Sequence, residues 1–288
     1  GLAIHPKKPI FVTGSDDQTI RLWSMTNFEM LSKAALTQQI RACAFDPEGQ
    51  QIAVGLTDGS FMVLRARDLS ELINIKDRKE VCHELKFSPC GKFLAVGSND
   101  GFVDVYAVDQ RYKKLGTCTG SSSFITHLDW SQGSKHIQVN NGKGERLVFR
   151  LQNFKQVTGE EELTSIHWAT FTSVLGPEVN GIWGKYTDTN DVNAADANFE
   201  AGVVVTGDDF GMVKLYKFPS LKKGAKFRKY VGHSAHVTNV RFSNDKFRVI
   251  STGGADHAIF QWKLLSHGVG DDDLPDHHTA YIDSDSEE

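Results

Sequence analysis

The sequence predicts an all-β fold made of repeated antiparallel sheets, arranged as a β-propeller. The clearest unit is Gly232 to Trp262, which holds three short alternating or β-branched runs at 237–242, 248–252 and 258–262. Turn residues separate these runs, and each run is too short for a helix, so the unit is a three-stranded meander. Similar units recur at intervals of 41, 42, 43, 67 and 46 residues. Because one such sheet cannot bury both of its faces, it needs neighbours of the same kind.

Each unit ends on a large apolar residue that lies nine positions after a turn residue. A period of about 40–45 residues, with Gly-His at the start and Trp at the end of the best copy, is typical of a propeller blade. Six blades are recognisable, and the apolar residues within 165–183 leave open a seventh, incomplete blade. The end residues are Trp23, Leu64, Tyr106, Phe149, Tyr216 and Trp262, and the turn residues are Gly14, Gly55, Gly97, Asn140, Gly207 and Gly253.

The expected strands follow in chain order from this alignment. The turns FDPEG (45–49) and FSPCG (87–91) separate first from second strands, because Pro sets a negative φ and Gly accepts a positive one. The first three units have four strands each, expected at 2–4, 10–13, 19–23 and 30–35, then at 41–45, 51–55, 60–64 and 72–75, then at 83–87, 92–97, 102–106 and 114–118; the fourth unit has strands at 125–130, 136–140 and 146–150.

The last unit is similar to a WD repeat, and the resemblance to WD-repeat propellers extends over residues 1 to about 264. It implies that His233 bonds Asp256 in the tight turn and that Ser251 links the histidine to Trp262. A buried imidazole, carboxylate and hydroxyl must satisfy one another in this way. The other units lack Gly-His, so we expect an irregular propeller over residues 1–265. The turn aspartates of the earlier units are Asp17, Asp58 and Asp100.

The fifth unit arrives about 25 residues late because of an insertion at about 165–200. The insertion begins as an alternating strand (Ile166, Trp168, Thr170), and the innermost strand is expected to resume at 192–195. Long structured insertions at propeller edges are usually functional or packing devices. Trp183 and Tyr186 are candidate partner contacts, since aromatic residues are enriched at binding hot spots. Burial of Trp183 in the core is an equally weighted alternative.

Several motifs in and after the insertion resemble the echinoderm microtubule-associated protein-like family. They are WAT (168–170), VLG (174–176), GIW (181–183), TNDVN (189–193), TGDDFG (206–211), GHSAHVTNV (232–240) and STGG (251–254). The resemblance implies two irregular propellers in tandem, of which this chain is similar to the second. It also implies a cytoplasmic, cytoskeletal protein whose partners are tubulin or microtubules and the companion propeller. A generic WD-repeat adaptor unrelated to microtubules is the alternative, because fold alone does not choose between them.

Charge is unevenly distributed along the chain. The net charge is −4, yet eight acidic residues and no Lys or Arg lie from Asp271 onward. The remaining 28 acidic and 32 basic residues give residues 1–270 a charge of about +4, well short of the basic stripe of a nucleic-acid binder. There is no apolar run near 18 residues and no signal peptide, so we expect neither a membrane span nor secretion. The four cysteines, Cys43, Cys82, Cys90 and Cys118, lack metal-type spacing and are expected to be small buried residues.

No catalytic, cofactor or metal site is predicted. His233, Asp256 and Ser251 are the residue types of a catalytic triad, but the WD-repeat resemblance gives them a structural role. The Gly142–Gly144 turn does not open a helix, as phosphate binding requires. His277 and His278 are expected to lie in a solvated linker. A basic cluster before the last unit is either a solvated loop or a contact to an acidic partner; it comprises Lys222, Lys223, Lys226 and Arg228, with Lys229 beside them.

The predicted ring lacks one strand. The chain begins at an innermost strand, within a strand pattern and without an initiator Met, which suggests an excised segment. It runs from the third strand of the last unit (259–264) directly into polar and acidic residues. Because exposed sheet edges are normally paired in propellers, we expect the closing strand to come from outside this sequence.

The acidic segment 266–288 is expected to be disordered, because its eight acidic and few apolar residues cannot bury enough surface to offset the entropy of ordering. Its backbone amides should therefore exchange with solvent deuterium without protection, and protection there would contradict the prediction. Ser284 and Ser286 precede acidic residues and are candidate phosphorylation sites, where phosphate would add negative charge.

Overall fold

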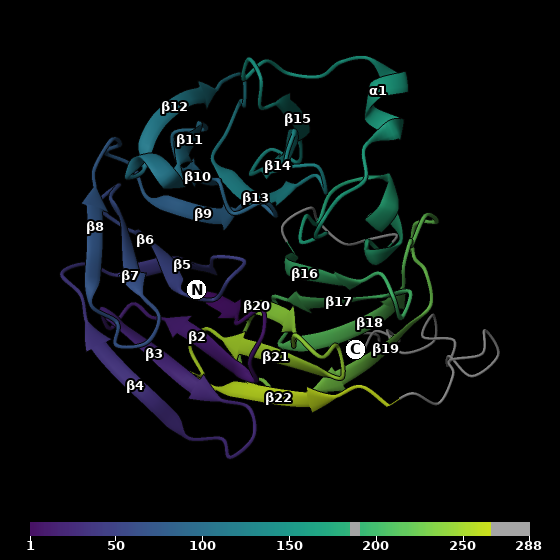
Figure 1. Ribbon diagram of the computed structural model, residues 1–288. Helices are drawn as coiled ribbons and strands as arrows, with labels where there is room; N and C mark the ends of the chain where they lie inside the picture. The colour runs from purple at the N-terminus through teal and green to yellow at the C-terminus, as the bar shows by residue number, and fades with distance from the viewer. Residues whose placement is uncertain (185–190, 266–288) are drawn as a thin grey trace, which may run out of the picture.

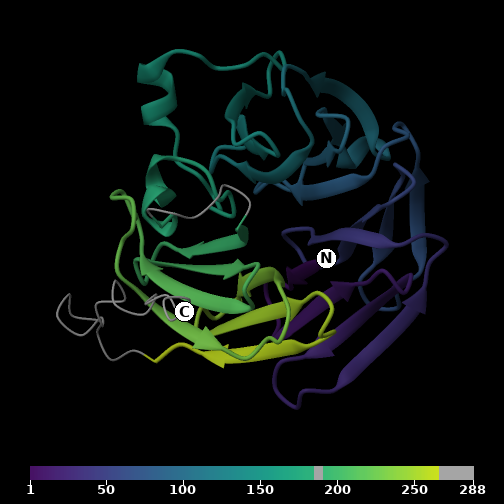
Figure 2. The same cartoon turned by 180° about the vertical axis from the view of Figure 1, so that it is seen from behind.

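The computed structural model describes residues 1–184 and 191–265 and shows a ring of six antiparallel sheets (Figures 1 and 2). Each sheet is one blade, so the predicted all-β propeller of six blades is confirmed. The strands are β1 (Leu2–Ile4), β2 (Ile10–Gly14), β3 (Thr19–Ser24) and β4 (Met30–Ala35) in blade 1; β5 (Ile40–Phe45), β6 (Gln51–Leu56), β7 (Phe61–Arg65) and β8 (Glu71–Ile75) in blade 2; β9 (Cys82–Phe87), β10 (Phe93–Ser98), β11 (Val103–Ala107) and β12 (Lys113–Cys118) in blade 3; β13 (Ile125–Trp130), β14 (His136–Asn141) and β15 (Arg146–Arg150) in blade 4; β16 (Val192–Asn198), β17 (Val203–Asp208), β18 (Met212–Lys217) and β19 (Phe227–Val231) in blade 5; and β20 (Val237–Phe242), β21 (Arg248–Gly253) and β22 (Ile259–Lys263) in blade 6.

The core is distributed between blades rather than gathered at the centre. Six clusters of buried apolar side chains occupy the six interfaces between neighbouring sheets. The interface that closes the ring, between blades 6 and 1, has the smallest cluster: Leu2, Phe11, Met25 and Ile250. There the Gln261 side-chain amide also donates a hydrogen bond to the Met25 carbonyl at 3.1 Å. Burial of each large aliphatic side chain contributes about 1.5–3 kcal/mol, so the ring is stabilised interface by interface.

The repeated glycine has a packing role in these interfaces. A Cβ added at Gly97 would lie 2.7 Å from the Ile125 side chain, at the start of the next innermost strand. The same position in blades 1, 2 and 5 faces the first residue of the following innermost strand, at Ile40, Cys82 and Val237. Only a residue without a Cβ allows so close an approach.

Blade 4 carries Asn140 in place of this glycine because the insertion, rather than the next innermost strand, comes first. The Asn140 carboxamide accepts a hydrogen bond from Leu175 N–H at 2.9 Å and donates one to the Leu175 carbonyl at 3.3 Å. The side chain thus pairs with the backbone of the insertion much as a strand would.

The insertion forms no blade among the described residues. Helix α1 (Glu160–Ser165) leads into it, and it contains the 3₁₀ helix η2 (Pro177–Ile182). The expected alternating strand at 166–170 is wrong, because only an isolated bridge joins Trp168 to Ser131. The backbone leaves the sheet there to reach a buried carboxylate of blade 4, described below. The innermost strand resumes at Val192, as predicted.

Blade 6 has three strands, and no fourth strand covers β22 among residues 1–184 and 191–265. The source of a closing strand remains a prediction. A shorter 3₁₀ helix, η1 (Val108–Gln110), follows β11 in blade 3.

Candidate functional site

Four side chains of blade 6 form one hydrogen-bonded chain that runs from a turn to the third strand. His233 Nδ1 lies 2.9 Å from Asp256 Oδ2, and His233 Nε2 lies 2.8 Å from Ser251 Oγ. The Trp262 indole N–H donates to the same Ser251 oxygen at 2.8 Å. Both the His233 ring and the Ser251 hydroxyl are buried. The structure therefore brings together the four residues that the WD-repeat resemblance joins.

The turn of blade 6 is shaped to hold this chain. A Cβ at Gly253 would lie 1.8 Å from Asp256 Oδ1 and 2.6 Å from His233 Nδ1. Burial alone would raise the pKa of Asp256, but the Ala258 N–H and the His233 ring hold it below its usual value. Ser251 is buried, and its oxygen accepts a hydrogen bond from the Trp262 indole. The arrangement is therefore suited to holding the strands of the blade together.

The turn aspartates of the first three blades bind their own turns instead. Asp17 accepts the Thr19 N–H at 2.9 Å, Asp58 accepts the Ser60 N–H at 3.0 Å, and Asp100 accepts the Phe102 N–H at 3.3 Å. Each also pairs with a cation, Arg21, Lys76 and Arg78 respectively. Their carboxylates are partly exposed, and none of them is the partner of a buried histidine.

Replacing Asp256 with Ala should lower the free energy of unfolding by about 1–3 kcal/mol, because the buried His233 loses its partner. Asp58→Ala is the matched control: it leaves no buried histidine without its partner, and the loss should be smaller. Urea denaturation of both variants measures the difference. Equal losses would show that the hydrogen-bonded chain of blade 6 contributes no more to the free energy of unfolding than an ordinary turn aspartate does.

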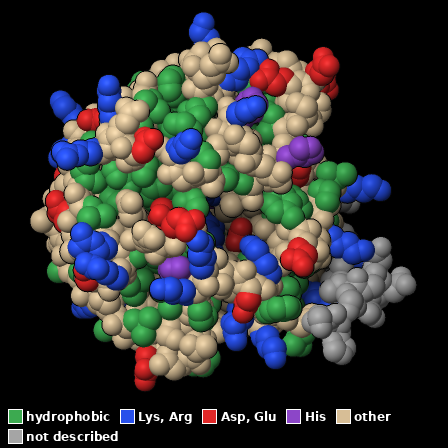
Figure 3. Space-filling view, in the orientation of Figure 1, with side chains coloured by type: hydrophobic (Ala, Val, Ile, Leu, Met, Phe, Trp, Pro, Cys, Tyr) green, Lys and Arg blue, Asp and Glu red, His purple; other side chains and the backbone are tan. Residues whose placement is uncertain are grey.

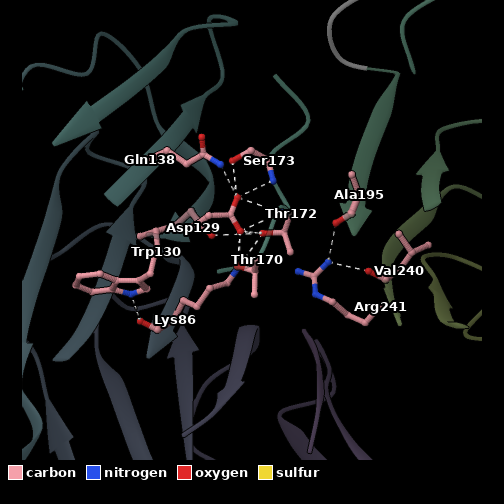
Figure 4. A network of polar contacts seen from close by, with 11 residues as sticks. Lys86, Asp129, Trp130, Gln138, Thr170, Thr172, Ser173, Ala195, Val240 and Arg241 are labelled. Atoms are coloured by element: carbon pink, nitrogen blue, oxygen red, sulfur yellow. Dashed lines mark hydrogen bonds and ion pairs between the residues drawn. The ribbon is translucent and has the colours of Figure 1, made fainter. Parts of the chain in front are cut away.

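A second polar network joins blade 4 to the insertion and was not predicted from the sequence (Figure 4). The Asp129 carboxylate is completely buried on β13 and accepts hydrogen bonds from Thr170, Thr172 and Ser173. Their Oγ atoms lie 2.7, 2.9 and 2.9 Å away, and the backbone N–H groups of Thr172 and Ser173 donate at 3.0 Å. Lys86 Nζ, at 3.1 Å, supplies the opposite charge.

These donors reverse the effect of burial on Asp129. Burial alone would raise its pKa, but the Lys86 ammonium and the hydrogen bonds from the insertion hold the pKa below its usual value. Neighbouring carboxylates have fewer donors, since Asp196 accepts one hydrogen bond from the Phe242 N–H at 2.7 Å, and burial raises the pKa of both Glu84 and Asp196. The only sequence signal for Asp129 is one acid between two apolar residues in ITHLDW.

The network lies at the wall of a central cavity of about 440 Å³ that Lys86, Glu84, Asp196 and Arg241 help to line. The Arg241 guanidinium donates to the carbonyls of Val240 and Ala195, at 2.8 and 3.3 Å (Figure 4). Figure 3 shows acidic and basic side chains close together around the centre of one face. Charges of both signs therefore ring the opening, without the single sign that would define one class of ligand.

Asp129→Asn should lower the free energy of unfolding at neutral pH by about 3 kcal/mol or more, because Lys86 and the insertion donors lose a buried anion. The lowered pKa means that this stabilisation is present above the pKa of the unfolded chain, about 4, and is lost as pH falls through the folded value. The variant should therefore lose part of the wild-type decline in stability below about pH 4. The control Asp100→Asn removes a partly exposed carboxylate and should change the free energy of unfolding by less than about 1 kcal/mol. Similar losses in both variants would contradict the role of Asp129 in holding the insertion to blade 4.

The remaining predicted residues divide between core and surface. Trp183 is 7% exposed and donates its indole N–H to the Val174 carbonyl at 2.9 Å. Its candidacy as a partner contact is therefore wrong: it belongs to the core between blades 4 and 5. Lys222, Lys223 and Lys226 are exposed in the β18–β19 loop, and Arg228 is half-buried on β19. Tyr186, His277, His278, Ser284 and Ser286 lie outside the described residues.

The cysteines and the glycine-rich turn are structural in the described parts of the chain. Cys43, Cys82 and Cys118 are buried, as expected, whereas Cys90 is exposed in its turn, contrary to expectation. The Gly142–Gly144 segment connects β14 to β15. No group of three His, Cys, Asp or Glu side chains could hold a metal ion within 1–184 and 191–265, and no helix there is long and apolar enough to cross a membrane.

The ring of blades and the His-Asp-Ser-Trp chain define an irregular WD-type β-propeller. A family model described as the echinoderm microtubule-associated protein second β-propeller matches residues 1–264. The chain therefore belongs to this family, as the motifs of the insertion indicated. A solved chain in a crystal structure of the mitotic checkpoint complex is similar in fold, with a TM-score of 0.71 over 91% of this chain and 86% of that one, at 12% identity.

Curated relatives are similar in sequence over nearly the whole propeller. The chain is 40% identical to echinoderm microtubule-associated protein-like 2 of Rattus norvegicus and 36% identical to the 77 kDa echinoderm microtubule-associated protein of Lytechinus variegatus. Each match covers 92% of this chain and about two fifths of the relative (41% and 40%). Echinoderm microtubule-associated protein-like 4 of Mus musculus is 38% identical, and the match covers 27% of its length.

Proposed function

We propose that this propeller is a non-enzymatic module that associates with tubulin or microtubules and acts in the cytoplasm as part of the cytoskeleton. The observation that carries the proposal is the match of residues 1–264 to one defined propeller of microtubule-associated proteins. The chain spans about two fifths of the first relatives, so a companion propeller of a longer protein is proposed as a second partner.

The geometry of the described sites supports a binding role. The His233 chain and the Asp129 network use buried polar atoms to hold blades and insertion together. Neither presents an exposed nucleophile or an open coordination position. A rigid ring of this kind offers its surface loops to partners, as propellers commonly do.

The basic cluster is the surface that we assign to an acidic partner. Its lysines at 222, 223 and 226 are exposed on a loop at the rim of blade 5. Exposed cations steer an acidic surface and accelerate its association, in a manner that salt suppresses. We propose no contact with nucleic acid or membrane.

Co-sedimentation and gel filtration with purified tubulin over a salt series test the proposal. The chain should associate at low salt and progressively less as salt rises. Lys222→Glu, Lys223→Glu and Lys226→Glu together should weaken the association by roughly tenfold, the sum of three surface ion pairs of about 0.5 kcal/mol each. The matched control reverses Lys92, Lys113 and Lys155, which are exposed on blades 3 and 4. No association of the wild-type chain at any salt concentration would contradict the proposal, and equal loss in both triple variants would contradict the assigned surface.

A further inference from the structure

We propose that the acidic segment 271–288 binds, within the same chain, to a basic surface on blade 5 that consists of Lys222, Lys223, Lys226, Arg228 and Lys229. The segment carries eight carboxylates and no Lys or Arg. The surface carries five cations on eight consecutive positions of the β18–β19 loop and β19. The two have opposite charge, and β22, the last strand before the segment, lies next to β19.

The basic surface gathers five cations on neighbouring positions, and their charges are uncompensated, whereas several other cations of the ring are paired. Arg78, Lys86, Lys114 and Lys214 each pair with a buried aspartate. None of the five cations of the basic surface forms an ion pair within residues 1–184 and 191–265. Lys and Arg side chains stand out at the rim of the ring near the β18–β19 loop (Figure 3, right side; compare Figure 1). Five like charges this close repel one another, so an anionic segment laid over them is favoured.

Strand β22, which precedes the acidic segment, ends close to this surface. The rings of Trp262 on β22 and Tyr230 on β19 lie 6.0 Å apart, so the end of β22 is next to β19. Only five residues lie between Leu265 and Asp271, and an extended chain spans up to about 20 Å over these six Cα–Cα steps. Strand β19 has five residues, a length of about 16 Å. A segment that starts at Asp271 can therefore extend along β19 toward the loop that carries the lysines.

Apolar residues at both ends of the basic surface add to the match. Leu221 is 60% exposed before the lysines, and Val231 is 72% exposed after β19. The acidic segment contains Leu274, Tyr281 and Ile282 among its carboxylates. The apolar residues of the segment can therefore pack against these exposed side chains while its carboxylates contact the cations.

Covalent connection makes weak contacts sufficient. The five residues 266–270 connect the segment to β22, and a short covalent connection gives an effective concentration in the millimolar range at the basic surface. Contacts between charged side chains need no backbone hydrogen bonds, so binding of the segment is compatible with free exchange of its amides. The contact should weaken strongly with salt, because the Debye length is about 8 Å at physiological ionic strength.

If the proposed association with an acidic partner holds, the segment competes with that partner for the same lysines. Phosphate on Ser284 or Ser286 would each add about −1.5 to −2 charges and strengthen the internal contact. Binding to tubulin would then decrease on phosphorylation. This consequence rests on the proposed function, whereas the internal contact itself does not.

Carbodiimide cross-linking of the full chain followed by peptide mass spectrometry tests the contact without tubulin. The reagent activates a carboxylate, and a lysine amine in contact with it forms an amide while the carboxylate oxygen leaves in the urea. At low salt we expect cross-links from Lys222, Lys223 and Lys226 to the acids of 271–288, with a yield that is independent of protein concentration. The yield should fall several-fold at about 0.5 M salt. Cross-links spread evenly to Lys92, Lys113 and Lys155, or a yield that rises with concentration, would overturn the proposal.

A labelled peptide of residues 266–288, added in trans, supplies a second readout. Replacing Asp271, Asp272, Asp273 and Asp276 with Asn in the chain should free the surface, so that the peptide binds about tenfold more tightly than it binds the wild type. Adding Lys222→Gln, Lys223→Gln and Lys226→Gln should abolish that gain, and the control Lys92→Gln, Lys113→Gln and Lys155→Gln should preserve it. Equal peptide affinity in wild type and Asn variant would overturn the internal contact. If the peptide binds as expected but the wild-type chain does not bind tubulin, only the proposed function is contradicted.

Discussion

Close approach between consecutive blades is the constraint on which this ring depends. Each sheet has two apolar faces, and neither can remain in water, so every blade must pack against the next. The glycine nine residues before the end of a repeat makes this approach sterically feasible, since a Cβ at Gly14 or Gly207 would lie 2.1 or 2.4 Å from the neighbouring strand's first side chain. The same glycines gave the clearest repeat in the sequence because packing permits nothing larger.

Blade 4 shows what replaces this arrangement when the next strand is delayed. Asn140 stands at the glycine position and pairs with the backbone of Leu175. Asp129, one strand further in, gathers the hydroxyl and N–H groups of the insertion around a fully buried carboxylate. Hydrogen bonds to side chains thus satisfy an irregular segment that forms no ladder, as buried backbone requires. The insertion then fills the space between blades 4 and 5 with apolar residues that include Trp183.

The interior polar networks and the surface charges have separate roles. His233 and Asp129 each serve a buried network, and both are shielded from partners. The uncompensated cations lie on the outer strand of blade 5 and in the loop before it, where the neighbouring blade ends in β22. A binding surface of this kind can vary without disturbing the ring, because exposed loop residues contribute little to stability.

The sequence by itself determined the all-β class, the number of recognisable blades, most strand positions and the family, since strand period, turn residues and repeat length are local properties. It also indicated the His233–Ser251–Asp256–Trp262 chain, because one repeat contains all four residues. Only the tertiary structure decided the path of the insertion, the burial of Trp183 and the role of Asp129. The donors to Asp129 lie about 40 residues away in sequence, as Thr172 does at a separation of 43, and no local pattern encodes which distant donors a buried carboxylate will meet.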